Sequence, residues 1–108
     1  MRLNIKPLSV NEAWQGKRFK TRKYAAYIRE MLRLLPQADI PSGYIEFEAT
    51  VGYSNSNADI DNFLKPFIDC LQKKYGFNDN KIYRLVINKV IVKKGHEFIE
   101  WKLTKLQQ

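Results

Sequence analysis

The sequence contains one cysteine, Cys70, and one histidine, His96, among 108 residues. A single cysteine excludes an intrachain disulfide. Because Cys70 falls in an apolar helical pattern, we expect it to pack in the core. His96 falls in a polar turn, where we expect it to be exposed, and this argues against a nuclease that uses histidine. No apolar run approaches the roughly 20 residues that a membrane-spanning helix needs. These absences favour a globular protein whose chemistry uses other side chains.

The chain also lacks internal repeats, linkers and low-complexity tracts. Its length therefore predicts a single domain over residues 1–108, small enough that dimerisation would add useful stability. The stretch Met1–Lys6 alternates polar and apolar residues and lacks the apolar stretch of a signal peptide. We therefore expect a cytoplasmic protein with no membrane partner.

Acidic residues are scarce, with 11 Asp and Glu against 19 Lys and Arg, which gives a formal net charge of +8. They are also unevenly placed, because residues 34–64 contain acidic residues but no Lys or Arg, whereas both flanking segments are basic. Surface lysines often serve solubility alone. An excess of this size on a small domain nevertheless favours contact with nucleic acid.

Hydrophobic periodicity gives an alternating order of strands and helices. The predicted elements are a strand at 2–6, a helix at 21–35, a strand at 45–51, a helix at about 61–75, and strands at 82–92 and 99–103. Residues 8–20 are interpreted as an irregular loop, residues 82–92 as a long central strand, and residues 93–96 as a hairpin turn. The order β-α-β-α-β-β predicts a two-layer α+β fold, with a mixed sheet of about four strands and two helices on one face.

Pro66 falls inside the second predicted helix and therefore constrains where this helix begins. Proline is tolerated in the first turn, because the N–H groups there have no partner within the helix. Asp59, Asp61 and Asn62 should consequently lie at the helix start. Gly76 is expected to end the helix.

Two carboxylates, Asp59 and Asp61, stand one residue apart, and Lys65 follows four residues after the second. Carboxylate oxygens are the ligands that Mg²⁺ prefers, usually with several waters and a substrate phosphate. Such an ion activates water and polarises a phosphoryl oxygen, and a lysine nearby stabilises the developing negative charge. The pattern therefore indicates phosphodiester hydrolysis. Acidic residues also serve as caps at helix starts, and Lys65 could equally be a solvated helix lysine.

A further carboxylate, Asp79, follows the same helix. A helix of 15 residues is about 22 Å long, so a direct return from Gly76 does not bring Asp79 to the other two aspartates. Three arrangements would do so: a shorter helix, a following strand that brings Asp79 round, or completion of the site across a dimer. The sequence leaves all three open.

The best candidate for contact with DNA phosphates is the basic segment before the first helix. It contains Lys17, Arg18, Lys20, Arg22 and Lys23, with Trp14 and Phe19 interleaved. Phe19 could stack or wedge at an opened junction centre, or simply pack the loop. Glu46 and Glu48 share one strand face and are interpreted as a solvated surface.

Three blocks of this chain resemble the RusA family of Holliday junction resolvases, which is common in phages and prophages. Residues 59–65 read D-I-D-N-F-L-K, similar to the family's D-x-D-N-x-x-K block. Residues 76–82 are similar to its second acidic block, and residues 7–11 to its proline–serine–asparagine opening. The resemblance covers about residues 3–104.

The resemblance implies that Asp59, Asp61 and Asp79 are metal-binding catalytic carboxylates and that Lys65 is the catalytic lysine. An alignment slipped by one residue would put Asn80 in the place of Asp79. The implied cofactor is Mg²⁺, with Mn²⁺ as an alternative and no organic cofactor. The implied enzyme is a homodimer that nicks four-way DNA junctions in pairs during recombination and repair. The alternatives are a metal-dependent nuclease for flaps or forks, and a non-catalytic basic DNA-binding protein.

Overall fold

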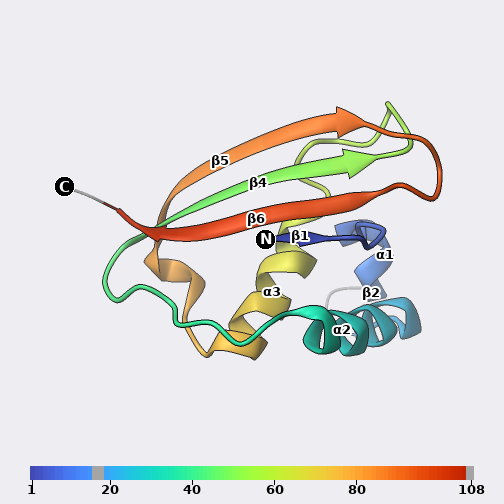
Figure 1. Ribbon diagram of the computed structural model, residues 1–108. Coiled ribbons are helices and arrows are strands. Elements are labelled where there is room, and N and C mark those ends of the chain that lie inside the picture. Colours follow the sequence, from blue (N-terminus) through green and yellow to red (C-terminus); the bar gives the residue numbers. More distant parts are fainter. Residues whose placement is uncertain (16–18, 107–108) are drawn as a thin grey trace.

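The computed structural model describes residues 1–15 and 19–106, without the side chain of Phe19. A four-stranded sheet forms one layer, and the helices cover one of its faces (Figure 1). The elements are β1 (Arg2–Leu3), α1 (Val10–Ala13), β2 (Trp14–Gln15), β3 (Phe19–Lys20), α2 (Arg22–Leu34), β4 (Ile45–Tyr53), α3 (Leu64–Tyr75), the 3₁₀ turn η1 (Asp79–Lys81), β5 (Ile82–Ile91) and β6 (Phe98–Lys105). The predicted α+β class is confirmed.

The strands of the sheet are ordered β1-β6-β4-β5. β4 is parallel to β5 and antiparallel to β6, so the sheet is mixed, as predicted. Two other predictions were wrong. β5 is an edge strand, not a central one. The segment 93–96 is not a hairpin turn, because the chain passes over the end of β4 to reach β6.

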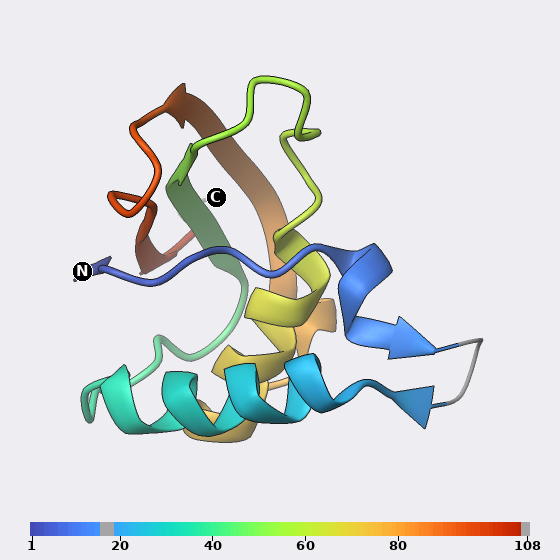
Figure 2. The ribbon, with the colours of Figure 1, turned by 90° about the vertical axis from the view of Figure 1, so that its right-hand side faces the viewer.

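The described residues between 8 and 20 contain more regular secondary structure than the sequence indicated. They contain the short helix α1 and the strands β2 and β3, which pair with each other as a small hairpin (Figure 2). Ser9 caps α1 by accepting a hydrogen bond from the backbone N–H of Asn11 at 3.0 Å. A four-residue helix and two-residue strands are too short to produce a recognisable hydrophobic period.

The two longer helices begin where local chemistry predicts. Thr21 caps α2, because its hydroxyl accepts a hydrogen bond from the backbone N–H of Tyr24 at 3.1 Å. Pro66 lies in the first turn of α3, which begins at Leu64. Gly76 ends α3 with a φ of 74°, a left-handed conformation that favours glycine.

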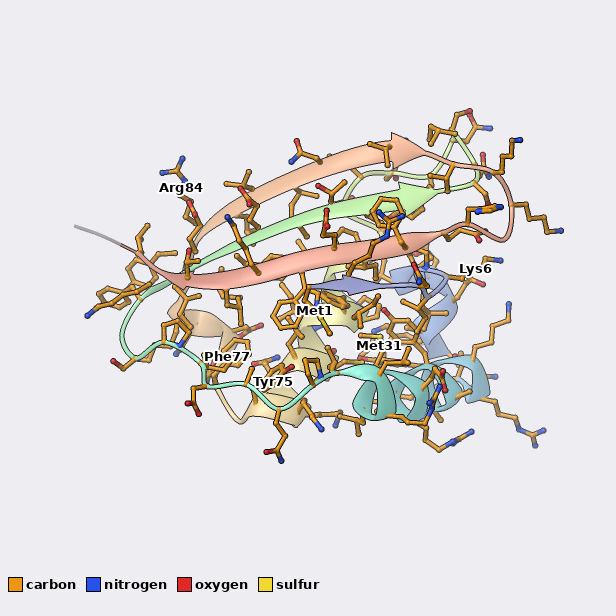
Figure 3. All side chains as sticks on the ribbon, viewed as in Figure 1. Met1, Lys6, Met31, Tyr75, Phe77 and Arg84 are labelled. Carbon is orange, nitrogen blue, oxygen red and sulfur yellow. The ribbon has the colours of Figure 1, made fainter. Side chains whose placement is uncertain are left out.

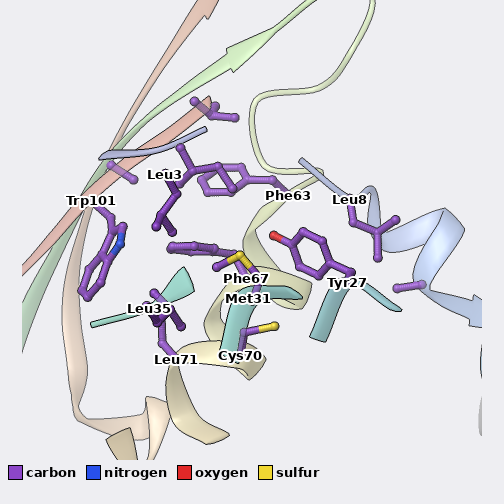
Figure 4. Packing of buried hydrophobic residues seen from close by; sticks show 14 of the residues in the cluster. Leu3, Leu8, Tyr27, Met31, Leu35, Phe63, Phe67, Cys70, Leu71 and Trp101 are labelled. Atoms are coloured by element: carbon purple, nitrogen blue, oxygen red, sulfur yellow. The ribbon is translucent and has the colours of Figure 1, made fainter. Parts of the chain in front are cut away.

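The core lies between the helices and the inner face of the sheet (Figure 4). Phe67 on α3 is its centre, with ring centroids 6.1 Å from Phe47, 6.0 Å from Phe63 and 6.1 Å from Trp101. Cys70 is fully buried, as expected. Among the described residues, no helix is long and apolar enough to cross a membrane.

The outer face of the sheet is solvated, which confirms the interpretation of Glu46 and Glu48. Glu46 pairs with Arg84 at 2.9 Å, and Glu48 pairs with Lys102 at 3.2 Å. Figure 3 shows Arg84 pointing away from the helices. His96 is exposed, as predicted.

Candidate active site

Asp59 and Asp61 lie on the connection between β4 and α3, residues 54–63, which we call the acidic turn. The backbone N–H of Asn62 donates to the carbonyl of Asp59 at 3.1 Å, and that of Leu64 donates to the carbonyl of Asp61 at 3.0 Å. Two successive tight turns therefore carry the chain into α3. Both aspartates precede the helix, close to the position that Pro66 indicated.

Three contacts from elsewhere in the fold anchor the acidic turn. The ammonium of Lys89 on β5 donates to the carbonyl of Ser56 at 3.0 Å and also to the carbonyl of Ala58. The backbone N–H of Phe63 donates to the hydroxyl of Tyr53 at 3.2 Å. The backbone N–H of Val10 donates to the carbonyl of Asn62 at 2.9 Å. Neither Lys89 nor Tyr53 was predicted to support the site.

The negative charges of both carboxylates act on the hydroxyl of Tyr53. Burial raises the pKa of Tyr53 to about 12, and the negative charges of Asp61 and Asp59 add to this rise. Both aspartates are exposed. Within residues 1–15 and 19–106, the structure gives their side chains no hydrogen bond and no ion pair. Two carboxylates without a neutralising partner are suited to a cation from solution.

Asp79 lies at the opposite end of α3 from Asp59 and Asp61. Its backbone N–H donates to the side-chain carbonyl of Gln72 at 2.8 Å, which fixes η1 beside the last turns of the helix. The 12 residues of α3 span about 18 Å. In the described part of one chain, no three acidic, histidine or cysteine side chains gather as metal ligands. Asn80 lies in the same turn as Asp79, after the end of α3.

Lys65, in the first turn of α3, lines an open groove of about 420 Å³ between the β2–β3 hairpin and this helix. The other residues that line it are Trp14, Lys20, Asp69, Gln72 and Lys73. Asp69 accepts a hydrogen bond from the hydroxyl of Tyr24 at 2.8 Å, and burial together with this bond raises the pKa of Tyr24. Sequence reasoning missed Asp69, although its spacing of four residues from Lys65 places both on one helix face.

A comparison with known families gives a match to Endodeoxyribonuclease RusA over residues 9–100. The chain belongs to the RusA family. Members are endodeoxyribonucleases that resolve Holliday junctions, bind branched DNA and generally depend on a divalent metal. The predicted enzyme class is therefore confirmed, and the non-catalytic binding protein is disfavoured. No curated protein matches the chain.

For a RusA enzyme, the groove that Lys65 lines also includes Lys20 from the basic segment predicted to contact DNA. Lys20 lies in the groove, with its ammonium 5.2 Å from the ring centroid of Tyr24. Arg22 is exposed at the start of α2, whereas Lys23 forms an ion pair with Glu12 at 3.0 Å. Lys17, Arg18 and the side chain of Phe19 lie outside the described residues.

Proposed function

We propose that this RusA protein is a Mg²⁺-dependent resolvase that cuts four-way DNA junctions by paired phosphodiester hydrolysis. The observation that carries the proposal is the pair of exposed carboxylates, without an ion pair in the described part of the chain, just before a helix whose first turn carries Lys65. Lys65 lines a groove together with two further lysines. Asp59 and Asp61 provide negative charge for a metal, and Lys65, Lys20 and Lys73 provide positive charge for a phosphate backbone.

The side chains present fit a hard divalent cation. Asp59 and Asp61 supply carboxylate oxygens, which suit Mg²⁺ and equally Mn²⁺, and Asp79 is proposed as the third carboxylate. When bound, such an ion lowers the pKa of a water molecule and polarises the phosphoryl oxygen. No organic cofactor is needed for this chemistry.

Lysine and arginine side chains of α3 and of the basic segment would hold the DNA and stabilise charge. Lys65 is placed to stabilise the negative charge that develops on the phosphoryl group and the leaving oxygen. Lys20 and Arg22 would contact phosphates, together with the predicted contacts Lys17, Arg18, Phe19 and Lys23. Asp69 would keep the groove from binding DNA too tightly, because it places one negative charge among the lysines.

Paired nicks require two equivalent active sites, and a homodimer supplies them on a substrate that is itself two-fold symmetric. We therefore propose that the active form is a homodimer. Its proposed setting is the cytoplasm, where a phage, prophage or host enzyme would act in recombination and DNA repair.

The decisive experiment is cleavage of a labelled four-way junction in Mg²⁺, beside a linear duplex and a flap. We expect symmetric, ligatable nicks in the junction that EDTA abolishes. Asp61→Asn should lose at least about a hundredfold in rate, because removing a metal ligand removes the activated water. Asp39→Asn is the matched control, since Asp39 is also exposed but lies between α2 and β4.

Two results would contradict the proposal. Tight junction binding without cleavage in either Mg²⁺ or Mn²⁺ would mean that the carboxylates form no working site. Faster cleavage of the flap than of the junction would identify a nuclease for other branched DNA.

A further inference from the structure

An open pocket of about 610 Å³ lies between the N-terminal segment and the connection from β5 to β6, and we call it the N-terminal pocket. Leu3 and Ile5 pack against the core, so the polar residues that alternate with them share the opposite side of the extended segment. This polar side lines the pocket. The charged and polar side chains in the lining are Arg2, Asn4, Lys6, His96 and Glu97.

The two cations of the N-terminal segment are available to a ligand, because both are exposed. The guanidinium carbon of Arg2 lies 3.8 Å from the ring centroid of Phe98, which holds the group in place without neutralising its charge. Within residues 1–15 and 19–106, the structure gives neither Arg2 nor Lys6 an ion pair. The pocket is therefore suited to an anion.

Glu97, the acidic side chain in the lining, is already engaged by the protein. One of its carboxylate oxygens accepts a hydrogen bond from the hydroxyl of Ser54 at 2.8 Å, and the other accepts one from the backbone N–H of Gly95 at 2.9 Å. Ser54 is the first residue of the acidic turn. Glu97 thus ties the β5–β6 connection to the acidic turn and leaves the cations of the pocket to a ligand.

A second pocket, of about 240 Å³, lies between the N-terminal pocket and the acidic turn. It shares Lys6 and Glu97 with the N-terminal pocket, and the acidic turn contributes Ser54, Asn55, Ala58 and Asn62 to its lining. Figure 2 shows the acidic turn, the β5–β6 connection and the N-terminal segment at the same end of the molecule. A DNA strand with one phosphate at the acidic turn can therefore place further phosphates in the N-terminal pocket.

We propose that the N-terminal pocket is a second binding site for DNA phosphates, separate from the groove that Lys20, Lys65 and Lys73 line. That DNA reaches the acidic turn rests on the proposed function, whereas the basic pocket itself does not depend on it. No described residue lines both the pocket and the groove, so one DNA molecule can occupy them together. The pocket offers charge and hydrogen-bond donors, which suit phosphates of any base sequence.

The site is tested by the salt dependence of junction binding in EDTA, where no strand is cut. Arg2→Gln with Lys6→Gln should lower the slope of log binding constant against log salt concentration by about 1.8, since each phosphate contact contributes about 0.9. Lys102→Gln with Lys105→Gln removes the same charge from exposed positions on β6 and is the matched control. Arg2→Lys with Lys6→Arg keeps both charges and should keep the slope.

The independence of the two sites is tested by combining variants. Arg2→Gln and Lys6→Gln, added to Lys20→Gln and Lys73→Gln in the groove, should lower the slope by about 3.6 in total, because four phosphate contacts are lost. A total that stays near 1.8 would mean that both sets of cations bind the same phosphates, and it would overturn the inference.

Direct contact is tested with the His96→Cys variant carrying iron–EDTA on its thiol. Cys70 is buried, so labelling is confined to the exposed new thiol. Hydroxyl radicals from the iron should cut the junction strands nearest to the pocket. The Asp39→Cys variant, labelled in the same way at an exposed position between α2 and β4, should produce no such cuts.

The outcomes separate this inference from the proposed function. A fall in slope no larger than in the control, or a His96→Cys probe that cuts no more than the Asp39→Cys probe, would overturn the inference even if the junction is resolved. If the slopes and the probe behave as expected but the wild type cuts no junction in Mg²⁺ or Mn²⁺, the second DNA site stands and the proposed function alone fails.

Discussion

Lys89 is the residue that connects the sheet to the acidic turn. Its ammonium donates to the carbonyls of Ser56 and Ala58, and it lies on the inner face of β5 opposite Val51 in the register. A partly buried lysine needs hydrogen-bond acceptors for its ammonium group. The ammonium of Lys89 also satisfies these two carbonyl groups, which would otherwise hydrogen-bond to water.

Lys89→Met should therefore loosen the acidic turn while keeping the fold. We expect faster amide exchange over residues 55–62, a loss of about 1–3 kcal/mol in the free energy of unfolding and slower junction cleavage. Mass spectrometry of deuterium uptake and urea unfolding measure the first two effects. Lys93→Met removes an exposed lysine in the following turn and serves as the control. Unchanged exchange in Lys89→Met would show that the lysine does not hold the turn.

The pairing of β4 with β6 depends on a glycine that lies beneath an aromatic ring. Gly52 faces Phe98 across the two strands, and a Cβ at position 52 would come within 2.5 Å of the Phe98 ring. Arg2 lies over the same ring, 3.8 Å from its centroid. The close approach of the ring thus requires a residue without a side chain.

Gly52→Ala should destabilise the protein by about 1–3 kcal/mol, because a buried ring must move. Chemical denaturation followed by circular dichroism measures this loss. The double variant Gly52→Ala with Phe98→Leu should recover part of the loss, since the smaller side chain makes room. Equal losses in the single and double variants would rule out the steric explanation.

At the scale of elements, the sequence predicted what short-range chemistry decides. Pro66 and Gly76 placed the start and the end of α3, and the D-I-D-N-F-L-K block placed the carboxylates and Lys65 beside the start of this helix. The order of the strands in the sheet was harder to predict from the sequence. β5 reads as a central strand because its edge is apolar, and an apolar edge and a buried strand share the same pattern. The supporting roles of Lys89 and Tyr53 were missed because they arise from contacts distant in sequence.

At the scale of the whole molecule, three lysines, Lys20, Lys65 and Lys73, line one groove. Replacing Lys20 and Lys73 with glutamine should lower the slope of log binding constant against log salt concentration by about 1.8, since each phosphate contact contributes about 0.9. Filter binding of a junction over a range of salt concentrations measures the slope. Lys102→Gln with Lys105→Gln, on β6, should leave it unchanged.

Buried tyrosines make the whole molecule sensitive to alkali. Burial raises the pKa of Tyr24, Tyr27 and Tyr53, in the last case to about 12, whereas an unfolded tyrosine titrates near 10. Above pH of about 10, the unfolded chain therefore loses protons that the folded chain retains, and the free energy of unfolding falls as pH rises. The contribution of Tyr53 is fully present below about pH 10 and is lost by about pH 12. Urea unfolding at about pH 8 and about pH 11 should show the decrease, and Tyr53→Phe should make it smaller.

The position of β6 between β1 and β4 has a consequence for synthesis on the ribosome. β1 pairs with β6, because Arg2 lies opposite Glu100 and Leu3 opposite Ile99. β4 pairs with β5 on one edge, and its other edge stays unpaired until β6 has been synthesised. The nascent chain thus carries an incomplete sheet until residues 98–105 have been synthesised, and the sheet is completed only then. If synthesis stops before residue 98, the released chain lacks β6, and one edge of β4 stays unpaired. Such a chain would need chaperones to prevent its aggregation.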